Sequence, residues 1–244
     1  MVNAAETDNG RLGILFTGGD GPPAEWLRTL SLPDRGLPPD SESSSGALLA
    51  AADSGLLLAE RAGLRPHWII GDMDSLEAER LAAYPPEIIL RYPHDKDFTD
   101  TELAFSLLRE KGCGPVWIIG GGGGRIDQLF GIRALFEREY PPERWVTARE
   151  DVRCIQAPSV SVCEGKGGVM FPSSVEVSSV HAPLDPVSVF PLGDGPWEAE
   201  SSGLTWPLAG LAWSRGFFGL SNSAPNGAFT VSAKRGRFFV ITPL

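Results

Sequence analysis

The sequence predicts an α/β N-terminal domain with a mainly parallel sheet, followed by an all-β, sandwich-like C-terminal domain. Up to about residue 140, short apolar runs alternate with helical patterns, which is typical of a parallel sheet covered by helices. After Pro141-Pro142, the chain becomes rich in Val, Ser, Phe and Gly in short alternating runs, which is typical of antiparallel sheets. We therefore expect two domains, residues 1–145 and 146–244.

Five apolar runs are candidate strands of the first domain: Leu12 to Thr17, Ala47 to Ala52, Trp68 to Ile70, Ile88 to Arg91, and Val116 to Ile119. Leu56 to Ala62 is a candidate helix that Gly63 ends. A second helix should begin at Thr99, because Thr99 and Glu102 form a capping-box pattern. A third should carry one apolar stripe and end near Tyr140; the stripe comprises Ile126, Leu129, Phe130 and Ala134.

Other segments predict loops and the strands of the second domain. Residues 31–46 are rich in Pro, Ser and Asp, which indicates a long exposed loop. In the second domain, Val175 to Val177 and Ala228 to Val231 alternate as strands do, and Gly and Pro separate such runs at short intervals.

The bulk composition narrows the class of protein. A net charge of −10 and a pI near 4.8 argue against a sequence-independent nucleic-acid binder, which needs a basic face. No apolar run approaches the ~20 residues of a membrane span, and the polar, acidic start is not that of a signal peptide. The three cysteines form no Cys-x-x-Cys pair, which fits a reducing compartment. We expect a soluble, cytoplasmic protein without nucleic-acid or membrane partners.

Three acidic or glycine-rich segments follow predicted strands and carry the functional signal. They are Gly71 to Ser75, Asp95 to Asp100, and Gly120 to Asp127. In open α/β sheets, ligands bind beyond the carboxyl ends of the strands. Carboxylates, a lysine, an arginine and glycine backbone gathered there indicate a site for a metal-bound polyphosphate.

The four aspartates in two of these segments are candidate magnesium ligands. Asp72 and Asp74, two residues apart on extended chain, can present both carboxylates to one side. Asp97 and Asp100 can do the same from a helix start, with Lys96 beside them. Mg²⁺ prefers such oxygen ligands together with water and phosphates. The alternative is that these aspartates only form turns and helix caps.

The glycine run and two other groups have weaker individual signals. Glycine lets backbone amides approach phosphate oxygens, but this run matches neither the Walker loop nor the dinucleotide fingerprint. Arg125 offers a planar fork to phosphate, and Asp127 can meet a cation, a ribose or an amine; both could instead form a surface salt bridge. Trp206 can stack on a cationic ring or fill the core, and Ser221-Asn222 by itself suggests a turn.

Taken together, these motifs resemble those of the thiamine pyrophosphokinase family. The family's Gly-Asp-x-Asp-Ser, Lys-Asp-x-Thr-Asp and Gly-Gly-Arg-x-Asp-His/Gln segments occur here in order as Gly71 to Ser75, Lys96 to Asp100, and Gly123 to Gln128. Shorter elements that also match are Gly18-Gly19 with Pro22, Ala52 to Gly55, Gly203 to Trp206, and Ser221-Asn222.

The resemblance implies a homodimer that transfers the pyrophosphoryl group of ATP to the thiamine hydroxyl, giving thiamine diphosphate and AMP with Mg²⁺ as cofactor. It assigns the first domain to ATP and magnesium, and the second to thiamine and dimerisation. The metal and catalytic residues it implies are Asp72, Asp74, Asp97 and Asp100, with Lys96 adding positive charge. It places Gly71, Ser75, Thr99, Gly123, Gly124 and Arg125 at the nucleotide, and Asp127, Gln128, Trp206, Ser221 and Asn222 at the second substrate.

Other functions remain open at this stage. A pterin alcohol could replace thiamine as acceptor, since both rings are flat and rich in nitrogen. A non-catalytic protein could bind the nucleotide or thiamine diphosphate, and a metal-dependent hydrolase could use the same carboxylates.

Overall fold

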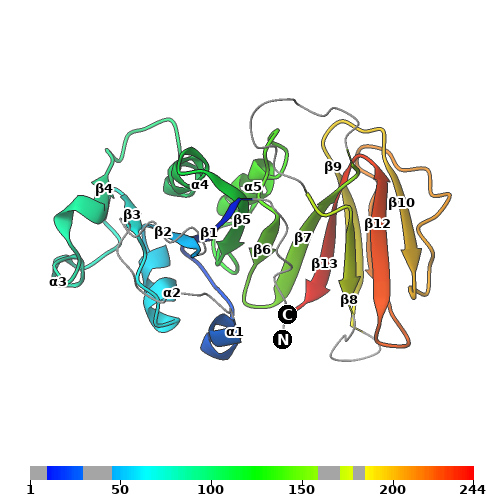
Figure 1. The fold of residues 1–244 in the computed structure, drawn as a ribbon, viewed down its shortest axis with the longest axis horizontal. Helices are drawn as coiled ribbons and strands as arrows, with labels where there is room; N and C mark the ends of the chain where they lie inside the picture. Colours follow the sequence, from blue (N-terminus) through cyan, green and yellow to red (C-terminus); the bar gives the residue numbers. More distant parts are fainter. Residues whose placement is uncertain (1–9, 30–45, 159–170, 178–184) are drawn as a thin grey trace. The chain divides into compact units, whose positions relative to one another are not determined.

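The computed structural model describes residues 10–29, 46–158, 171–177 and 185–244 of the chain. These residues form two compact units. The first comprises residues up to Arg133 together with Val146–Ala148, and the second comprises Ala134–Trp145 and Arg149–Leu244 (Figure 1).

A parallel sheet forms the centre of the first unit, with its strands in the order β5-β1-β2-β3-β4. The strands are β1 (Arg11–Phe16), β2 (Leu48–Ala52), β3 (Trp68–Gly71), β4 (Ile89–Arg91) and β5 (Cys113–Ile119). Strand β2 is buried along its whole length, as expected where helices cover both faces of a parallel sheet. All five strands expected from the apolar runs form.

The helices of the first unit are α1 (Ala24–Thr29), α2 (Gly55–Arg61), α3 (Ala78–Leu81), the 3₁₀ turn η1 (Pro86–Ile88), α4 (Asp100–Glu110) and α5 (Ile126–Leu135). The predicted capping box is confirmed, because the Glu102 amide donates to Thr99 Oγ1 and the Thr99 amide donates to Glu102 Oε2. The predicted end of α5 near Tyr140 is wrong. After Leu135 the backbone tightens into i−3 turns, and Phe136 packs edge-on against Phe239 at 4.8 Å.

The second unit contains two antiparallel groups of strands. One has the order β11-β9-β13-β7, and the other has the order β10-β12-β8. Their bounds are β7 (Glu150–Gln156), β8 (Ser174–Val177), β9 (Val187–Leu192), β10 (Glu198–Ser202), β11 (Gly219–Asn222), β12 (Phe229–Arg235) and β13 (Arg237–Pro243). The short strand β6 (Arg144–Val146) precedes β7.

A shared apolar core joins the two groups of strands. Val189 and Phe238 from one group and Val231 from the other belong to this buried cluster, and Trp213 meets the Phe238 ring edge-on at 5.0 Å. Side chains of both sheets thus fill one interior, which is the sandwich arrangement expected from the alternating runs.

Three remaining expectations concern loops, cysteines and membranes. Residues 31–45 of the expected loop lie outside the described part of the chain, as does Cys163. Cys113 and Cys154 are buried free thiols. None of the helices in the described residues is long and apolar enough to cross a bilayer.

Candidate functional site

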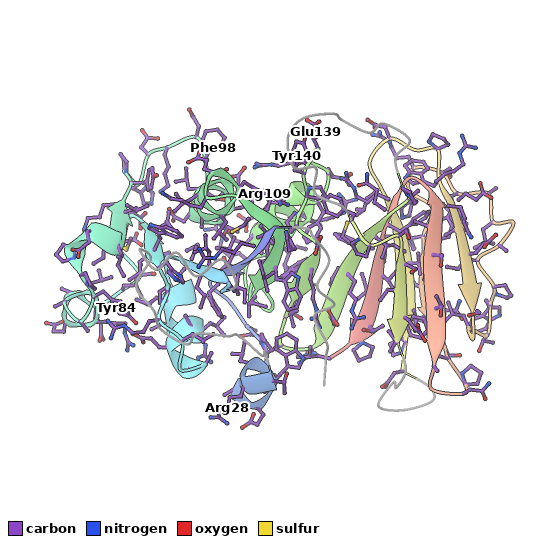
Figure 2. The ribbon with its side chains drawn as sticks, in the orientation of Figure 1. Arg28, Tyr84, Phe98, Arg109, Glu139 and Tyr140 are labelled. Atoms are coloured by element: carbon purple, nitrogen blue, oxygen red, sulfur yellow. The ribbon has the colours of Figure 1, made fainter. Side chains whose placement is uncertain are left out.

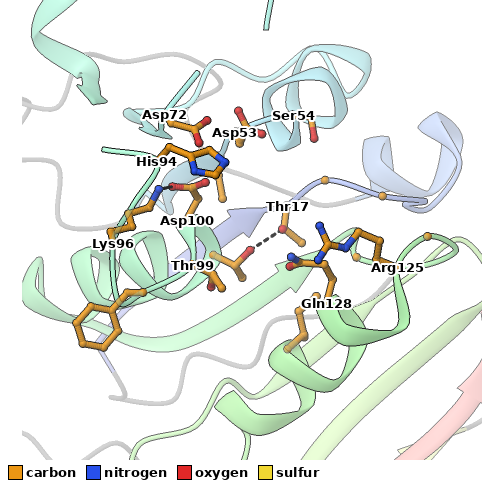
Figure 3. Close-up of a pocket in the computed structure, with 18 of the residues that line it drawn as sticks. Thr17, Asp53, Ser54, Asp72, His94, Lys96, Thr99, Asp100, Arg125 and Gln128 are labelled. Atoms are coloured by element: carbon orange, nitrogen blue, oxygen red, sulfur yellow. Dashed lines mark hydrogen bonds and ion pairs between the residues drawn. The ribbon is translucent and has the colours of Figure 1, made fainter. Parts of the chain in front are cut away.

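A pocket of about 510 Å³ lies beyond the carboxyl ends of the parallel strands in the first unit (Figure 3). The predicted site residues in its wall are Asp72, Lys96, Asp97, Thr99, Asp100, Gly124, Arg125 and Gln128. Thr17 at the end of β1 and Thr101 at the start of α4 share a buried hydrogen bond of 2.7 Å between their hydroxyls. This bond ties the helix that carries Asp100 to the centre of the sheet.

Asp72 and Asp74 form a tight turn directly after β3. The Asp74 amide donates to Asp72 Oδ1 at 3.2 Å, and Met73 between them adopts a left-handed φ of 67°. This backbone hydrogen bond lowers the pKa of Asp72, whereas the side-chain interaction with Asp72 raises the pKa of Asp74. Two neighbouring carboxylates that oppose each other's ionisation are typical of a cation site.

Asp100, the first residue of α4, pairs with Lys96 from the segment that precedes the helix. Lys96 Nζ lies 3.1 Å from Asp100 Oδ1, and it also donates to the carbonyl of Pro93. Burial raises the pKa of Asp100, although Lys96 opposes this shift. Phe98, between the predicted acidic residues of this segment, lies beside the start of α4 and is largely exposed (Figure 2).

Asp53, which was not among the predicted site residues, lies in the pocket wall at the end of β2. Its Oδ1 atom is buried and finds no hydrogen-bond partner among the described residues. Gly71 permits this arrangement: with φ at 154°, a Cβ there would lie 3.3 Å from both Asp53 Cβ and Asp100 Cγ. The sequence signal was present, because Asp53 follows a predicted strand just as Asp72 does.

The amides of the first three glycines of the run bond within the fold. The amides of Gly120, Gly121 and Gly122 donate to the carbonyls of Val146, Gly18 and Asp20, respectively. These bonds join the run to β6 and to the loop after β1, and Gly121 and Gly122 also line the pocket. Among the predicted residues of the run, Gly124 lines the pocket.

Arg125 and Asp127 pair with each other at the start of α5. Arg125 Nε donates to Asp127 Oδ1 at 3.1 Å, and the second guanidinium nitrogen lies 2.5 Å from Oδ2. The pairing raises the pKa of Arg125 and lowers that of Asp127. Since both side chains are exposed, water screens this ion pair and Arg125 can exchange Asp127 for another anion at little cost.

Three predicted site residues of the second unit, Trp206, Ser221 and Asn222, lie close to one another. Asn222 is only 7% exposed, and its amide group clamps the backbone of Trp206: the Trp206 amide donates to Oδ1 at 3.1 Å, and Nδ2 donates to the Trp206 carbonyl at 2.7 Å. The Trp206 ring itself is 61% exposed, which excludes the alternative that it fills the core. Ser221 adopts a left-handed φ of 55° beside Asn222.

The donors in the pocket suit a hard divalent cation. They include the Asp72 carboxylate, with the Asp74 carboxylate beside it, and the buried Asp53 oxygen lacks the partner that a cation would supply. Among the described residues, the group whose ligand atoms lie within 4.8 Å of one another is Asp72, Asp74 and His94. Asp97 and Asp100 line the same pocket outside this group.

Structural comparison finds the same fold in several solved structures. Thiamin pyrophosphokinase from Geobacillus thermodenitrificans is 23% identical, with a TM-score of 0.64 and coverage of 96% of this chain and 97% of that one. The Bacillus subtilis thiamine pyrophosphokinase is 20% identical, with a TM-score of 0.68 and coverages of 96% and 98%. Yeast thiamin pyrophosphokinase is 15% identical, with a TM-score of 0.58 and coverages of 98% and 88%.

Sequence comparison adds a family-model match to part of the chain. No curated protein sequence matches the chain significantly. Residues 40–141, which contain all three acidic or glycine-rich segments, match the family model described as thiamin pyrophosphokinase, catalytic domain. Residues 40–141 thus resemble the catalytic domain of the thiamin pyrophosphokinase family, and the fold over nearly the whole chain is that of solved thiamin pyrophosphokinase structures.

Proposed function

We propose that the protein transfers the pyrophosphoryl group of ATP to the hydroxyl of thiamine, giving thiamine diphosphate and AMP. The observation that carries this proposal is the pocket at the carboxyl edge of the parallel sheet, where Asp72 and Asp100 share a wall with Lys96 and Arg125. Carboxylates for a cation beside two positive side chains match the needs of a bound polyphosphate. The family match over the same residues supports this assignment.

We assign Asp72, Asp97 and Asp100 in the pocket wall, and Asp74 beside Asp72, to hold Mg²⁺. When bound, Mg²⁺ would neutralise charge on the ATP phosphates. Lys96 and Arg125 would stabilise negative charge that develops on the departing AMP oxygen. Asp100, at the start of α4 in the pocket wall, is our candidate acceptor of the thiamine hydroxyl proton.

We assign ATP and magnesium to residues 1–145, and thiamine and dimerisation to residues 146–244. The exposed Trp206 ring can stack on the cationic ring of thiamine, with Asn222 holding its backbone in place. A homodimer would cover the apolar side chains that each unit exposes: Ile126 and Phe130 on α5, and Phe218 and Leu220 in the second unit. The two buried free thiols are consistent with a cytoplasmic location.

The test is AMP formation from Mg-ATP, measured by chromatography with and without thiamine. We expect AMP only when thiamine is present, in equal amount with thiamine diphosphate. If AMP appears only with a pterin alcohol, the protein is still a pyrophosphokinase, but its acceptor is the pterin and not thiamine. Nucleotide hydrolysis without any acceptor would indicate a hydrolase, and nucleotide binding without AMP would indicate a binding protein.

A further inference from the structure

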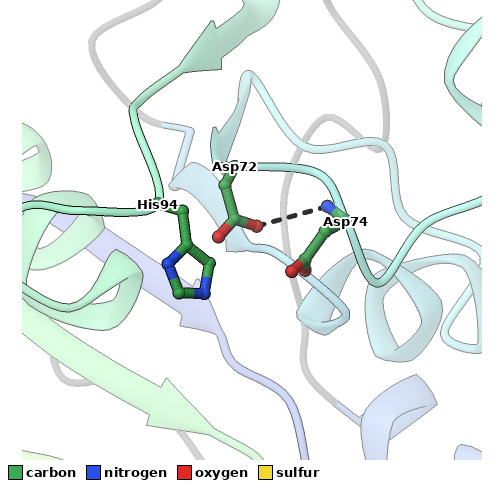
Figure 4. Close-up of side chains that lie close together, drawn as sticks. All are labelled: Asp72, Asp74 and His94. Carbon is green, nitrogen blue, oxygen red and sulfur yellow. Dashed lines mark hydrogen bonds between the residues drawn. The ribbon is translucent and has the colours of Figure 1, made fainter.

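His94 lies against the two carboxylates that follow β3. Its imidazole faces Asp72 and Asp74 from a separate segment of the chain (Figure 4), and the ligand atoms of the three side chains lie within 4.8 Å of one another. The sequence alone gives this histidine no role, since it shows no ligand spacing there.

The pairing of β3 with β4 brings His94 to this position. The strands are parallel neighbours with Gly71 opposite Arg91, and the Tyr92 amide extends the pairing by donating to the Gly71 carbonyl at 2.9 Å. Asp72 therefore comes one residue after the end of its strand, and His94 three residues after the end of the next. Because parallel strands end at the same edge of a sheet, the fold itself places the imidazole beside the carboxylates.

The three ligand atoms lie near enough to one another for side-chain rotation to bring them to one cation. Metal–ligand bonds of about 2.1 Å put adjacent ligand atoms about 3.0 Å apart and opposite ones about 4.2 Å apart. At least two of the three pairs must be adjacent, so a pair at the observed limit of 4.8 Å would have to close by up to about 1.8 Å. Asp74 and His94 are both exposed, so rotation of their side chains can supply it without disturbing the core.

We propose that His94 is a protein ligand of the divalent cation held by Asp72 and Asp74, and that its nitrogen shifts the preference of the site from Mg²⁺ toward transition-metal cations such as Co²⁺ and Zn²⁺. Mg²⁺ favours oxygen ligands and keeps its water, whereas imidazole suits the later first-row metals. The inference rests on the proposed function, because this is the site that the transfer reaction would use. To that function, the inference adds the class of metal ion that the site prefers.

The experiment measures metal binding to the full-length protein without nucleotide or thiamine, so that it does not depend on turnover. Co²⁺ affinity is obtained by calorimetry and visible absorption, and Mg²⁺ affinity by competition. His94→Gln is the informative variant, since the glutamine amide offers its oxygen as a ligand and lacks the imidazole nitrogen. We expect it to weaken Co²⁺ binding about tenfold or more and to change Mg²⁺ binding by less than about threefold.

Two further measurements make the result decisive. In the wild type, Co²⁺ should shift the proton resonances of one imidazole strongly, and His94→Gln should abolish these signals. Asp95→Asn removes an exposed charge from the same segment and should weaken both cations alike, leaving their ratio unchanged. An unchanged ratio in His94→Gln, or no shifted imidazole in the wild type, would overturn the inference.

The metal inference and the proposed reaction can fail separately. If AMP formation depends on thiamine and His94→Gln leaves the ratio of Co²⁺ to Mg²⁺ affinity unchanged, His94 is not a metal ligand, whereas the proposed reaction is supported. If Co²⁺ shifts the imidazole proton resonances but the protein makes no AMP, the proposed reaction is rejected and His94 is still supported as a metal ligand.

Discussion

Removing the Asn222 side chain tests whether the exposed Trp206 is held in place by a single buried amide. Asn222→Ala deletes three hydrogen bonds: two to the Trp206 backbone, at 3.1 and 2.7 Å, and one from the Ser223 amide at 2.9 Å. A typical hydrogen bond contributes about 1 kcal/mol net, so the free energy of unfolding of the second unit should fall by about 3 kcal/mol. Partial rehydration of the released backbone groups would bring the loss nearer 2 kcal/mol.

Urea unfolding followed by near-ultraviolet circular dichroism measures this loss. Trp206→Ala is the matched control, because its largely exposed ring contributes little to folding and should cost less than about 0.5 kcal/mol. If the ring contacts thiamine, however, Trp206→Ala should raise KM for thiamine about tenfold or more, a change of at least ~1.4 kcal/mol in binding. A loss below about 1 kcal/mol in Asn222→Ala would refute the clamp.

Three further changes test the first unit. Asp72→Asn should lower the rate of AMP formation about 100-fold or more and leave the thermal midpoint unchanged, because the proposed cation loses a charged ligand; near-normal turnover would remove Asp72 from the site. Thr99→Ala should cost about 1 kcal/mol of stability in thermal unfolding, since it breaks the capping box with Glu102; an unchanged midpoint would show that the cap contributes nothing. His67 accepts a hydrogen bond from the Leu49 amide on Nδ1 at 3.0 Å, and burial, aided by Arg11, lowers its pKa below the usual 6.5. The unfolded chain therefore takes up this proton first, so stability should fall as pH drops below about 6.5, and His67→Gln should flatten that part of the pH profile; an unaltered slope would contradict the assignment.

The order of strands and helices in the first unit was predictable because local signals agree there. Buried strands of a parallel sheet are continuous apolar runs, and β2 is a plain example, with Leu48–Ala52 buried throughout. The start of α4 was equally clear, because a capping box uses residues only three apart. The end of α5 was not, because Phe136 leaves the helix to pack against Phe239, which is distant in sequence.

In the candidate site too, residues with a local sequence signal were predictable, and residues that depend on contacts distant in sequence were not. Asp72, Asp97 and Asp100 stand out because each belongs to a short acidic segment after a strand, and all three line one pocket. Asp53 has a weaker local pattern, and its buried oxygen becomes informative only when Gly71 is seen to leave room for it beside Asp100. Which glycine amides bond within the fold likewise depends on pairing between two loops.

Strand pairing explains why the histidine escapes a sequence-based search for metal sites. Such a search looks for ligands at a fixed spacing along one element, as in a helix that presents residues four apart. Asp72 and His94 are instead related by register, since Gly71 pairs with Arg91 across two parallel strands and the connecting segment can have any length. In a parallel sheet, the relevant spacing is the number of residues beyond each strand end, which is one for Asp72 and three for His94. A search that aligns the ends of candidate strands and compares the residues immediately after them would bring Asp53, Asp72 and His94 together from the amino-acid sequence alone.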